Sequence, residues 1–513
     1  MLEILVVFLI LCLRRIRGLW YLARGPDIID KAYLSAEGMP FKISTPSNDH
    51  WLVTSNDLIT ELANAPLQNL SLHAVAKEIL QPKYTMFGFE WQDQRGVEGT
   101  GFVRALRSRL TAHLPILMPE LQRIVETAIA DELAVPGKDA GFVHCRLFSM
   151  IKRTVTKVNC FAFFGEDLGT ITSLARQSHQ ANYVAAQNPE FTAAALEFPQ
   201  RVILAAEILR ITPGFLRRSV ANLVTRQHYA VRTLFRYLEP IVEKRLATRA
   251  KSTSAIQEDA PMDCMQWLID TSPRKIQWTT TRMVGEIIAV WFGSVHQLAM
   301  VRQQARTTTT YAIEDLCLHN DYVEPLRAEI QQYLAGSCRR RVAEMPLLDS
   351  FVRESIRCTN SDAITVRRKA LTPFVFSDGL EVAEGDWVCI PQRAMMRDRI
   401  RYQNPQAFDG FRFARANKQL RAGDVSLDVP ESSPLMMTDV SVDWPIWGLG
   451  NTACPGRFYA ATILKLIMVC ILEGWECRLE DPGSQRWRTW RSSIVPREGT
   501  VVLFKRKEEA LTG

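Results

Sequence analysis

A cysteine on a glycine-rich loop, directly ahead of a long apolar run, is the feature that most limits what this chain can fold into. Residues 447–456 read Trp-Gly-Leu-Gly-Asn-Thr-Ala-Cys-Pro-Gly, and a segment with helical spacing follows. A thiol at a helix N-terminus meets unpaired N–H groups and the positive end of the helix dipole, so its anion is favoured and can bind iron. Gly450 and Gly456 would let a flat group approach the backbone beside Trp447. Alone, however, such a cysteine is more often a buried structural residue than the metal ligand that Cys454 would be.

The rest of the composition predicts one large domain. The 513 residues are 47% hydrophobic, and the polar stretch 250–261 is too short to be more than a surface loop. The net charge of +7 is modest, and no basic block with interleaved aromatic residues indicates a nucleic-acid partner. The 11 cysteines show no Cys-x-x-Cys spacing, so neither a zinc site nor a disulfide framework is indicated.

The N-terminus predicts a membrane anchor. Residues 1–13 are almost entirely apolar, and Arg14, Arg15 and Arg17 follow at once. Positive charge after an apolar run keeps the following domain on the cytosolic side. The run is shorter than the span of about 20 residues that a bilayer needs, so we expect a short or tilted anchor within 1–24, with a buried core helix as the alternative. The catalytic domain would then be 25–513.

The periodicity predicts a mainly α fold with a small β subdomain. Helical spacing dominates from Leu121 to Arg357, and the uninterrupted run from Thr281 to Leu316 would form one long helix. Strand-like alternation occurs in three segments, 41–53, 363–391 and 500–504.

A charged pair and a distant arginine supply a second constellation. Glu354 and Arg357 stand three residues apart on one helical face, where an ion pair is possible. Any exposed helix surface offers such a pair, so the motif says little alone. It gains weight because Arg412, within a Phe-Arg-Phe run, and then Cys454 follow in order.

This ordered set resembles the cytochrome P450 superfamily, the haem-thiolate monooxygenases. The family's loop pattern, Phe-x-x-Gly-x-Arg/His-x-Cys-x-Gly, is matched at Gly450, Cys454 and Gly456. Trp447 replaces the phenylalanine, and Thr452 replaces the basic residue that usually contacts a haem propionate. The resemblance implies the cytochrome P450 fold as a single large domain and haem b bound through the cysteine.

The same resemblance assigns further residues to the cofactor. It implies that Glu354, Arg357 and Arg412 form a buried network that fixes the cysteine loop. Neighbouring residues on a strand point to opposite faces, so Arg367 or Arg368 can face the haem. We assign Arg368 to a propionate, with Arg367 in reserve, and regard Arg107 as a weaker candidate on a solvated basic helix.

The central helix shows a partial match to the family's oxygen-activating motif. Gly293 fits the small position that lets O₂ lie in the helix groove, while His296 stands at the acid and Gln297 at the threonine. Both polar residues are also compatible with a buried helix that has no catalytic task. Beyond them, 301–307 reads as an insertion of about seven residues, close to two helical turns. The tetrad Thr307–Thr310 is a poor helix former and predicts a break.

The likeness is strongest to fungal membrane-bound members that oxidise terpenoids and related secondary metabolites. It implies a monooxygenase that inserts one oxygen atom from O₂ into an apolar small molecule. Electrons would come from NADPH through a reductase, at the cytosolic side of the endoplasmic reticulum membrane. Gln297 and Thr452 leave open a haem-thiolate isomerase, dehydratase or peroxide-using enzyme, and the apparent insertion after Met300 leaves open a catalytically impaired haem-binding protein.

Overall fold

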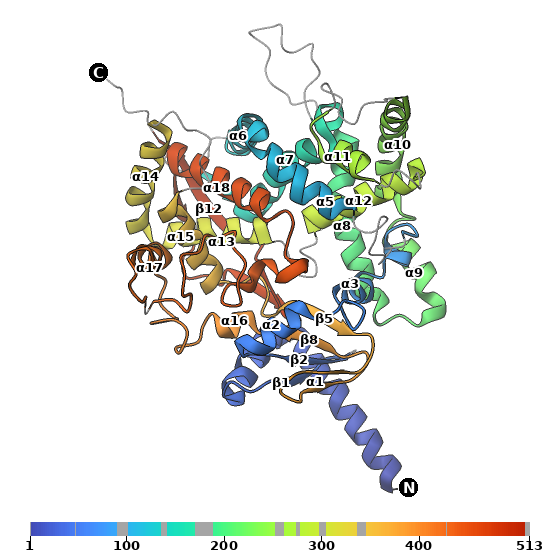
Figure 1. Cartoon of the computed structure of the whole chain (residues 1–513). Coiled ribbons are helices and arrows are strands. Elements are labelled where there is room, and N and C mark those ends of the chain that lie inside the picture. Colours follow the sequence, from blue (N-terminus) through green and yellow to red (C-terminus); the bar gives the residue numbers. More distant parts are fainter. Residues whose placement is uncertain are drawn as a thin grey trace, which may run out of the picture. The chain divides into compact units, whose positions relative to one another are not determined.

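The structure is a computed structural model, and it describes residues 2–46, 48–89, 101–134, 141–169, 188–251, 261–272, 278–296, 304–335, 345–426 and 428–507. The described elements are mostly helices, with small sheets, as the periodicity predicts (Figure 1). Two compact units share the chain. Unit 1 contains residues 1–75, 129–151 and 301–513, and unit 2 contains residues 76–128 and 152–300.

Small sheets form the β part of unit 1. One sheet has the order β1-β2-β8-β5-β3, from β1 (Phe41–Ser44), β2 (Asp49–Leu52), β8 (Trp387–Ile390), β5 (Thr365–Ala370) and β3 (Leu70–Ser71). A second has the order β4-β12-β9, from β4 (Val143–Arg146), β12 (Val501–Arg506) and β9 (Trp475–Leu479). Two antiparallel pairs complete the set: β6 (Phe374–Val375) with β7 (Glu381–Val382), and β10 (Trp487–Trp490) with β11 (Ser493–Pro496). Strands therefore lie in all three segments where alternation predicts them.

Helices surround these sheets in unit 1. They are α1 (Leu2–Ala36), α2 (Asn56–Asn64), α13 (Gln304–Leu318), α14 (Val323–Ala335), α15 (Pro346–Cys358), α16 (Gln392–Met395), α17 (Arg412–Arg421) and α18 (Arg457–Gly474). α13 packs against both α15 and α18 (Figure 1). α18 is the helix that follows Cys454, and 12 of its 18 residues are buried. The cysteine helix therefore lies in the core of this unit.

The secondary-structure elements in the described part of unit 2 are all helices. Its elements are α4 (Pro82–Thr85), α5 (Gly101–Arg104), the π-helix η1 (Ala105–Leu110), α8 (Pro189–Leu209), the short turn η3 (Gly214–Leu216), α9 (Arg217–Val224), α10 (Tyr229–Lys251), α11 (Cys264–Thr271) and α12 (Thr280–His296). Three helices cross between the residue ranges of the two units: α3 (Leu72–Leu80), α6 (Thr111–Glu132) and α7 (Leu147–Gly169). Trp291 of α12 packs on Phe164 of α7, with ring centroids 4.9 Å apart, and donates to the Ala195 carbonyl of α8 at 3.1 Å. This aromatic packing fixes α12 within its unit.

The expectation of one long central helix from Thr281 to Leu316 stays a prediction over its middle part. The structure describes α12 to His296 and α13 from Gln304, and residues 297–303 between them lie outside the described part. The expected break at Thr307–Thr310 is wrong, because all four residues lie within α13 and are buried. Burial in the core outweighs the low helix propensity of threonine.

The N-terminal helix also extends further than its apolar run. α1 continues to Ala36, and the boundary expected at residue 24 falls inside it, at a kink where Arg24 leaves helical geometry before Pro26. Gly25 is needed there, because a Cβ would lie 2.1 Å from the carbonyl oxygen of Arg491. Within the described part of the chain, no helix has both the length and the apolar character needed to cross a membrane.

A buried acidic pair lies on α13 and shares one cation. Arg486 contacts Asp315 at 2.7 Å and Glu314 at 3.5 Å, and Ser355 donates to Asp315 at 2.6 Å. Glu314 has no exposed surface, and neither of its carboxylate oxygens receives a hydrogen bond. Asp315 therefore accepts hydrogen bonds that Glu314 lacks among the described residues.

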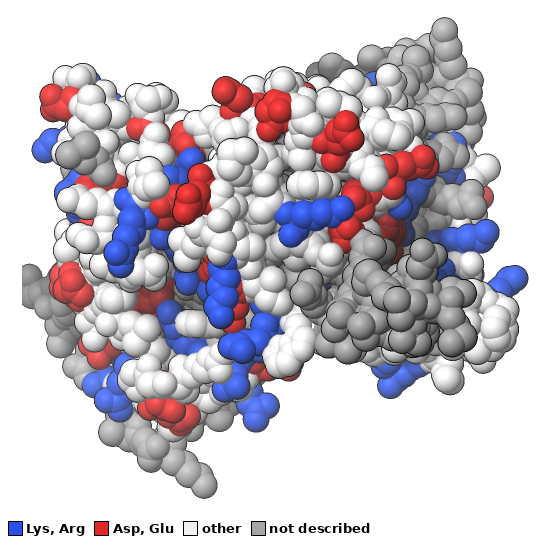
Figure 2. Space-filling model, turned by 90° about the horizontal axis from the view of Figure 1, so that it is seen from below, with Lys and Arg blue, Asp and Glu red and all other residues white. Residues whose placement is uncertain are grey.

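Charges of both signs are mixed on the surface drawn in Figure 2. Lys and Arg side chains are interspersed there with Asp and Glu side chains. The modest positive net charge is thus not gathered into one block on this face.

Candidate functional site

Cys454 lies on a loop that two short turns hold in place. These are η7 (Pro445–Trp447) and η8 (Gly450–Thr452), and α18 begins at Arg457. The backbone N–H of Cys454 donates to the carbonyl oxygen of Trp447 at 2.7 Å. This hydrogen bond closes the loop across seven residues and places the thiol just before the first turn of the helix, as the sequence predicts.

Two glycines of the loop are required by its geometry. Gly448 and Gly450 have φ angles of +79° and +56°, in the region where side chains are disfavoured. A Cβ on Gly450 would also lie 3.1 Å from the carbonyl oxygen of Ala63, because α2 packs against this turn. Among the described residues, and apart from its two chain neighbours, no atom lies within 4 Å of the place where Gly456 would carry a Cβ. The loop thus combines tight backbone packing with open space beside the cysteine.

Side-chain donors anchor both ends of the loop to the preceding segment. The indole N–H of the buried Trp447 donates to the carbonyl of Met437 at 2.7 Å. Arg457 donates to the carbonyl of Thr438 at 2.8 Å and to that of Cys454 at 3.1 Å. Trp447 is therefore a structural anchor of the loop, a role that an indole N–H can perform and a phenyl ring cannot.

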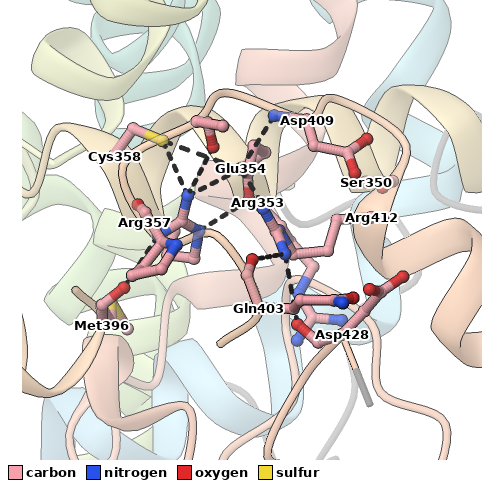
Figure 3. Close-up of polar contacts among 12 residues, drawn as sticks. Ser350, Arg353, Glu354, Arg357, Cys358, Met396, Gln403, Asp409, Arg412 and Asp428 are labelled. Atoms are coloured by element: carbon pink, nitrogen blue, oxygen red, sulfur yellow. Dashed lines mark hydrogen bonds and ion pairs between the residues drawn. The ribbon is translucent and has the colours of Figure 1, made fainter. Parts of the chain in front are cut away.

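The predicted network of Glu354, Arg357 and Arg412 is present and buried (Figure 3). Arg357 donates to both oxygens of Glu354, each at 2.8 Å, and the Nε of Arg412 lies 3.3 Å from the same carboxylate. The backbone N–H of Asp409 adds a third donor at 3.0 Å. The remaining guanidinium N–H groups donate to the carbonyls of Met396, Pro405, Ala407, Gln403 and Asp428. The contacts of Arg357 with the carbonyls of Met396, Pro405 and Ala407, and those of Glu354 with Arg412 and Asp409, tie α15 to segment 396–428.

The ion pair fixes the charge state of Arg357. Burial by itself lowers the pKa of a guanidinium, but the hydrogen bonds and the negative charge of Glu354 outweigh it and hold the pKa of Arg357 above its ordinary value. Arg357 therefore stays protonated in the core. Its job is structural, because none of its contacts reaches the loop at 447–456 directly.

The link from this network to the loop comes from Arg353, which sequence reasoning missed. Its guanidinium donates to Glu431 at 2.7 Å and to the carbonyl of Leu435 at 2.7 Å. It also lies 3.9 Å from the ring centre of Phe413 and 4.6 Å from that of Trp444. Arg353 thus joins the helix of Glu354 to the segment that enters the cysteine loop.

A second ion pair that the sequence did not predict connects the segments before and after the cysteine loop. Lys465 on α18 contacts Asp349 on α15 at 2.6 Å, and both side chains are buried. The other oxygen of Asp349 accepts the backbone N–H of Met437 at 2.9 Å. One carboxylate therefore holds both the segment before the loop and the helix after it. The available signal was a single lysine inside an otherwise apolar helix.

Arg367 and Arg368 take different partners, as adjacent strand residues should. Arg367 donates to Asp362 at 2.7 Å and to Ser492 at 3.1 Å. Arg368 donates to the hydroxyl of Thr452 on the cysteine loop, and to the carbonyl of Arg367 at 3.2 Å. Arg368 thus lies beside the cysteine loop, and its assignment to the cofactor stays a prediction. Arg107 is exposed on η1, as expected for a solvated basic face.

The candidates for oxygen chemistry are only partly described. Gly293 is buried in α12, within the helix that carries Trp291. His296 is the last residue of that helix, and its side chain is outside the described part, as is the whole of Gln297. Their proposed roles therefore remain predictions.

The described residues near the cysteine supply donor types that suit a haem. They supply a soft thiol ligand at Cys454, open space beside Gly456, and a buried guanidinium at Arg368 that can bind a carboxylate. These are the donor types that a macrocycle with iron and carboxylate groups needs. The donor set thus agrees with the cofactor that the sequence predicts.

Comparison with known proteins gives one consistent result. Residues 85–503 match the family model described as Cytochrome P450. Cytochrome P450 monooxygenase 151 of Postia placenta is 26% identical over 466 residues, covering 90% of this chain and 85% of the relative. Cytochrome P450 monooxygenase olcJ of Penicillium canescens is 25% identical over 479 residues, covering 92% of this chain and 81% of the relative.

A solved structure shows the same fold. It is described as retinoic acid bound cyanobacterial CYP120A1, and it matches with a TM-score of 0.63 and 16% sequence identity. The match covers 95% of this chain and 97% of that one, so residues of both units take part in it.

Proposed function

The chain belongs to the cytochrome P450 family and is a monooxygenase of it, and we propose that it inserts one oxygen atom from O₂ into an apolar small molecule. The proposed substrate is a terpenoid or another intermediate of secondary metabolism, on the strength of the fungal resemblance. The observation that carries the proposal is the cysteine loop, with Cys454 placed before α18 and framed by buried ion pairs.

Each residue of the loop and its frame has a defined task in this function. Cys454 would bind the iron of haem b, and haem held through a thiolate supplies the site at which O₂ is activated. Arg368 would bind a carboxylate of the cofactor, and Gly456 leaves room for it. Glu354 and Arg357 keep the surrounding backbone fixed without touching the reacting atoms.

Proton handling is assigned to the end of α12. Each oxygen insertion consumes protons, so a donor that changes charge near neutral pH is useful there. His296 has that property and Gln297 can orient water, while the absence of a side chain at Gly293 leaves space on the helix. We propose these three residues as the catalytic set on that side.

We further propose that NADPH supplies the electrons through a reductase at the endoplasmic reticulum membrane. Besides the N-terminal run, one surface of unit 2 supports membrane contact. Ile211, Phe215 and Leu223 are 87%, 85% and 79% exposed around η3 and α9. Residues 208–238 contain no Asp or Glu, and they include Arg210, Arg217, Arg218, Arg226, Arg232 and Arg236. Exposed apolar side chains among arginines suit the surface of an anionic bilayer.

The reduced carbon monoxide difference spectrum tests the central claim. Wild type should show the thiolate-type Soret band, and Cys454→Ala should lose it while still folding. A band that is absent from wild type, or that survives the substitution, overturns the assignment of Cys454. Turnover with NADPH and a reductase, but not with peroxide alone, then separates the monooxygenase from a peroxide-using enzyme.

A further inference from the structure

Strand β5 carries an irregularity at the point where its arginines begin. Thr365 pairs with Ile390 and Arg368 with Val388, so β5 has one residue more than β8 between these pairs. Val366 lies in this bulge with a φ of +48°, which a β-branched side chain rarely adopts. A bulge redirects the side chains next to it, and such strain persists only where the surroundings demand it. The local backbone therefore sets the direction of Arg368.

The hydroxyl of Thr452 accepts a hydrogen bond from Arg368, while its own proton is donated elsewhere. Its O–H donates to the carbonyl of Leu449 at 2.8 Å, inside the loop. The oxygen then accepts the Nη2–H of Arg368. Because the proton points into the loop, a lone pair points toward the guanidinium, and the contact has one fixed direction. Arg368 itself is 1% exposed.

This contact stands where the family's loop pattern has a basic residue. A basic side chain there would place a second positive charge beside Arg368, whereas threonine is neutral and accepts a hydrogen bond from it. A guanidinium has five N–H donors, so a contact with Thr452 is compatible with binding a carboxylate at the same time. The neutral Thr452 thus orients the guanidinium of Arg368 and adds no second positive charge.

We propose that Thr452 is a positioning residue, which holds the guanidinium of Arg368 in the orientation that binds a haem carboxylate. The inference rests on the proposed function, since it needs haem at Cys454. Thr452 would act entirely through Arg368, as a neutral residue at a position where the family has a cation.

Haem loss to an excess of a haem-scavenging protein tests this role in the full-length, haem-loaded chain. Thr452→Val keeps the size of the side chain but removes the acceptor, and we expect haem loss about tenfold faster, as for a hydrogen bond to a charged group. Thr452→Ser restores the hydroxyl and should stay within about threefold of wild type. Thr462→Val, at a buried threonine on α18, is the control and should match wild type.

A double-substitution cycle separates positioning from a merely structural role. If Thr452 acts through Arg368, then Thr452→Val should change haem loss less than about twofold in an Arg368→Gln background. Equal effects in both backgrounds would overturn the inference, because they would mean that the hydroxyl only supports the loop. The carbon monoxide spectrum keeps the two hypotheses apart: wild type without a thiolate-type band refutes the proposed function and this inference with it, whereas additive effects with an intact band refute the inference alone.

Discussion

Arg357 and Glu354 face each other across one turn of α15, joined by two hydrogen bonds of 2.8 Å, and neither side chain has any exposed surface. The same guanidinium also holds the carbonyls of Met396 and Pro405. The pair therefore fixes three separate stretches of backbone with one planar group.

Arg357→Lys should be strongly destabilising. An ammonium group cannot bind both oxygens of Glu354 and also reach the two carbonyls, so buried acceptors are left unpaired. Breaking a buried pair costs about 3–5 kcal/mol, and we expect the apparent free energy of unfolding in urea to fall by that order, with a lower yield of haem-loaded protein.

The matched control for this prediction is Arg415→Lys. Arg415 pairs with Asp409 but its side chain is 50% exposed, so the change should be below about 0.5 kcal/mol. If both variants lost the same free energy of unfolding, burial of the Arg357–Glu354 pair would not add to its contribution to stability.

Lys465→Met should weaken the frame from the other side of the loop. The substitution leaves the buried carboxylate of Asp349 without its cation, which costs about 3–5 kcal/mol. Adding Asp349→Leu removes that carboxylate, so the double variant should lose less free energy of unfolding than the sum of the single variants. Denaturant unfolding of the four proteins measures this coupling, and strict additivity would contradict it.

The raised pKa of the Glu314 carboxyl predicts that the free energy of unfolding falls as pH rises. Burial raises the pKa of its carboxyl to about 8, opposed by the charge of Arg486 and reinforced by that of Asp315. Below the ordinary value of 4.5 the group is protonated in both states, so it costs nothing there. Between 4.5 and about 8 only the unfolded chain releases the proton, and stability declines until the pKa of the folded state is passed.

Glu314→Gln should remove this decline, since an amide does not titrate. The free energy of unfolding of the variant should depend less on pH between about 5 and 8, by up to about 1 kcal/mol per pH unit. Unfolding curves at a series of pH values measure the difference. Identical pH profiles in wild type and variant would show that Glu314 is ionised in the folded protein.

Substitutions in the exposed patch of unit 2 should weaken binding to anionic vesicles. Phe215→Ser and Leu223→Ser each remove an apolar side chain that is 85% or 79% exposed, and we expect affinity to drop by about threefold or more. Val425→Ser is the control, because Val425 is 83% exposed but follows the acidic Asp424. Vesicle co-sedimentation gives the measurement. Unchanged binding in both patch variants would argue against this surface.

Local patterns were sufficient for much of the fold and for the cysteine loop. Alternation located β1, β2 and β12, and glycine spacing located Cys454, because both signals lie within a few neighbouring residues. The frame of the loop was harder. Arg353 and Glu431 are 78 residues apart, and Asp349 and Lys465 are 116 apart. The sequence around a single charged residue in a helix does not indicate which distant residue it pairs with. Only the three-dimensional structure therefore reveals these two ion pairs.

Propensity misled where tertiary packing decides. Thr307–Thr310 read as a helix break, yet all four residues are buried within α13, between its contacts with α15 and α18. The low helix propensity of a run of threonines has little effect on a helix that is stabilised by packing in the core.

The position of β12 in its sheet has a consequence for the order of folding during synthesis. This strand, Val501–Arg506, lies between β4 and β9, so the sheet cannot close until the ribosome has delivered residues beyond 500. β4 is made more than 350 residues earlier and must wait, as must the helices that pack on this sheet. Non-local pairing of this kind is slow and leaves strand edges open in the meantime. A nonsense or frameshift mutation shortly before residue 501 would therefore spare Cys454 and every residue of its frame, yet leave a nascent chain exposed to proteases and aggregation.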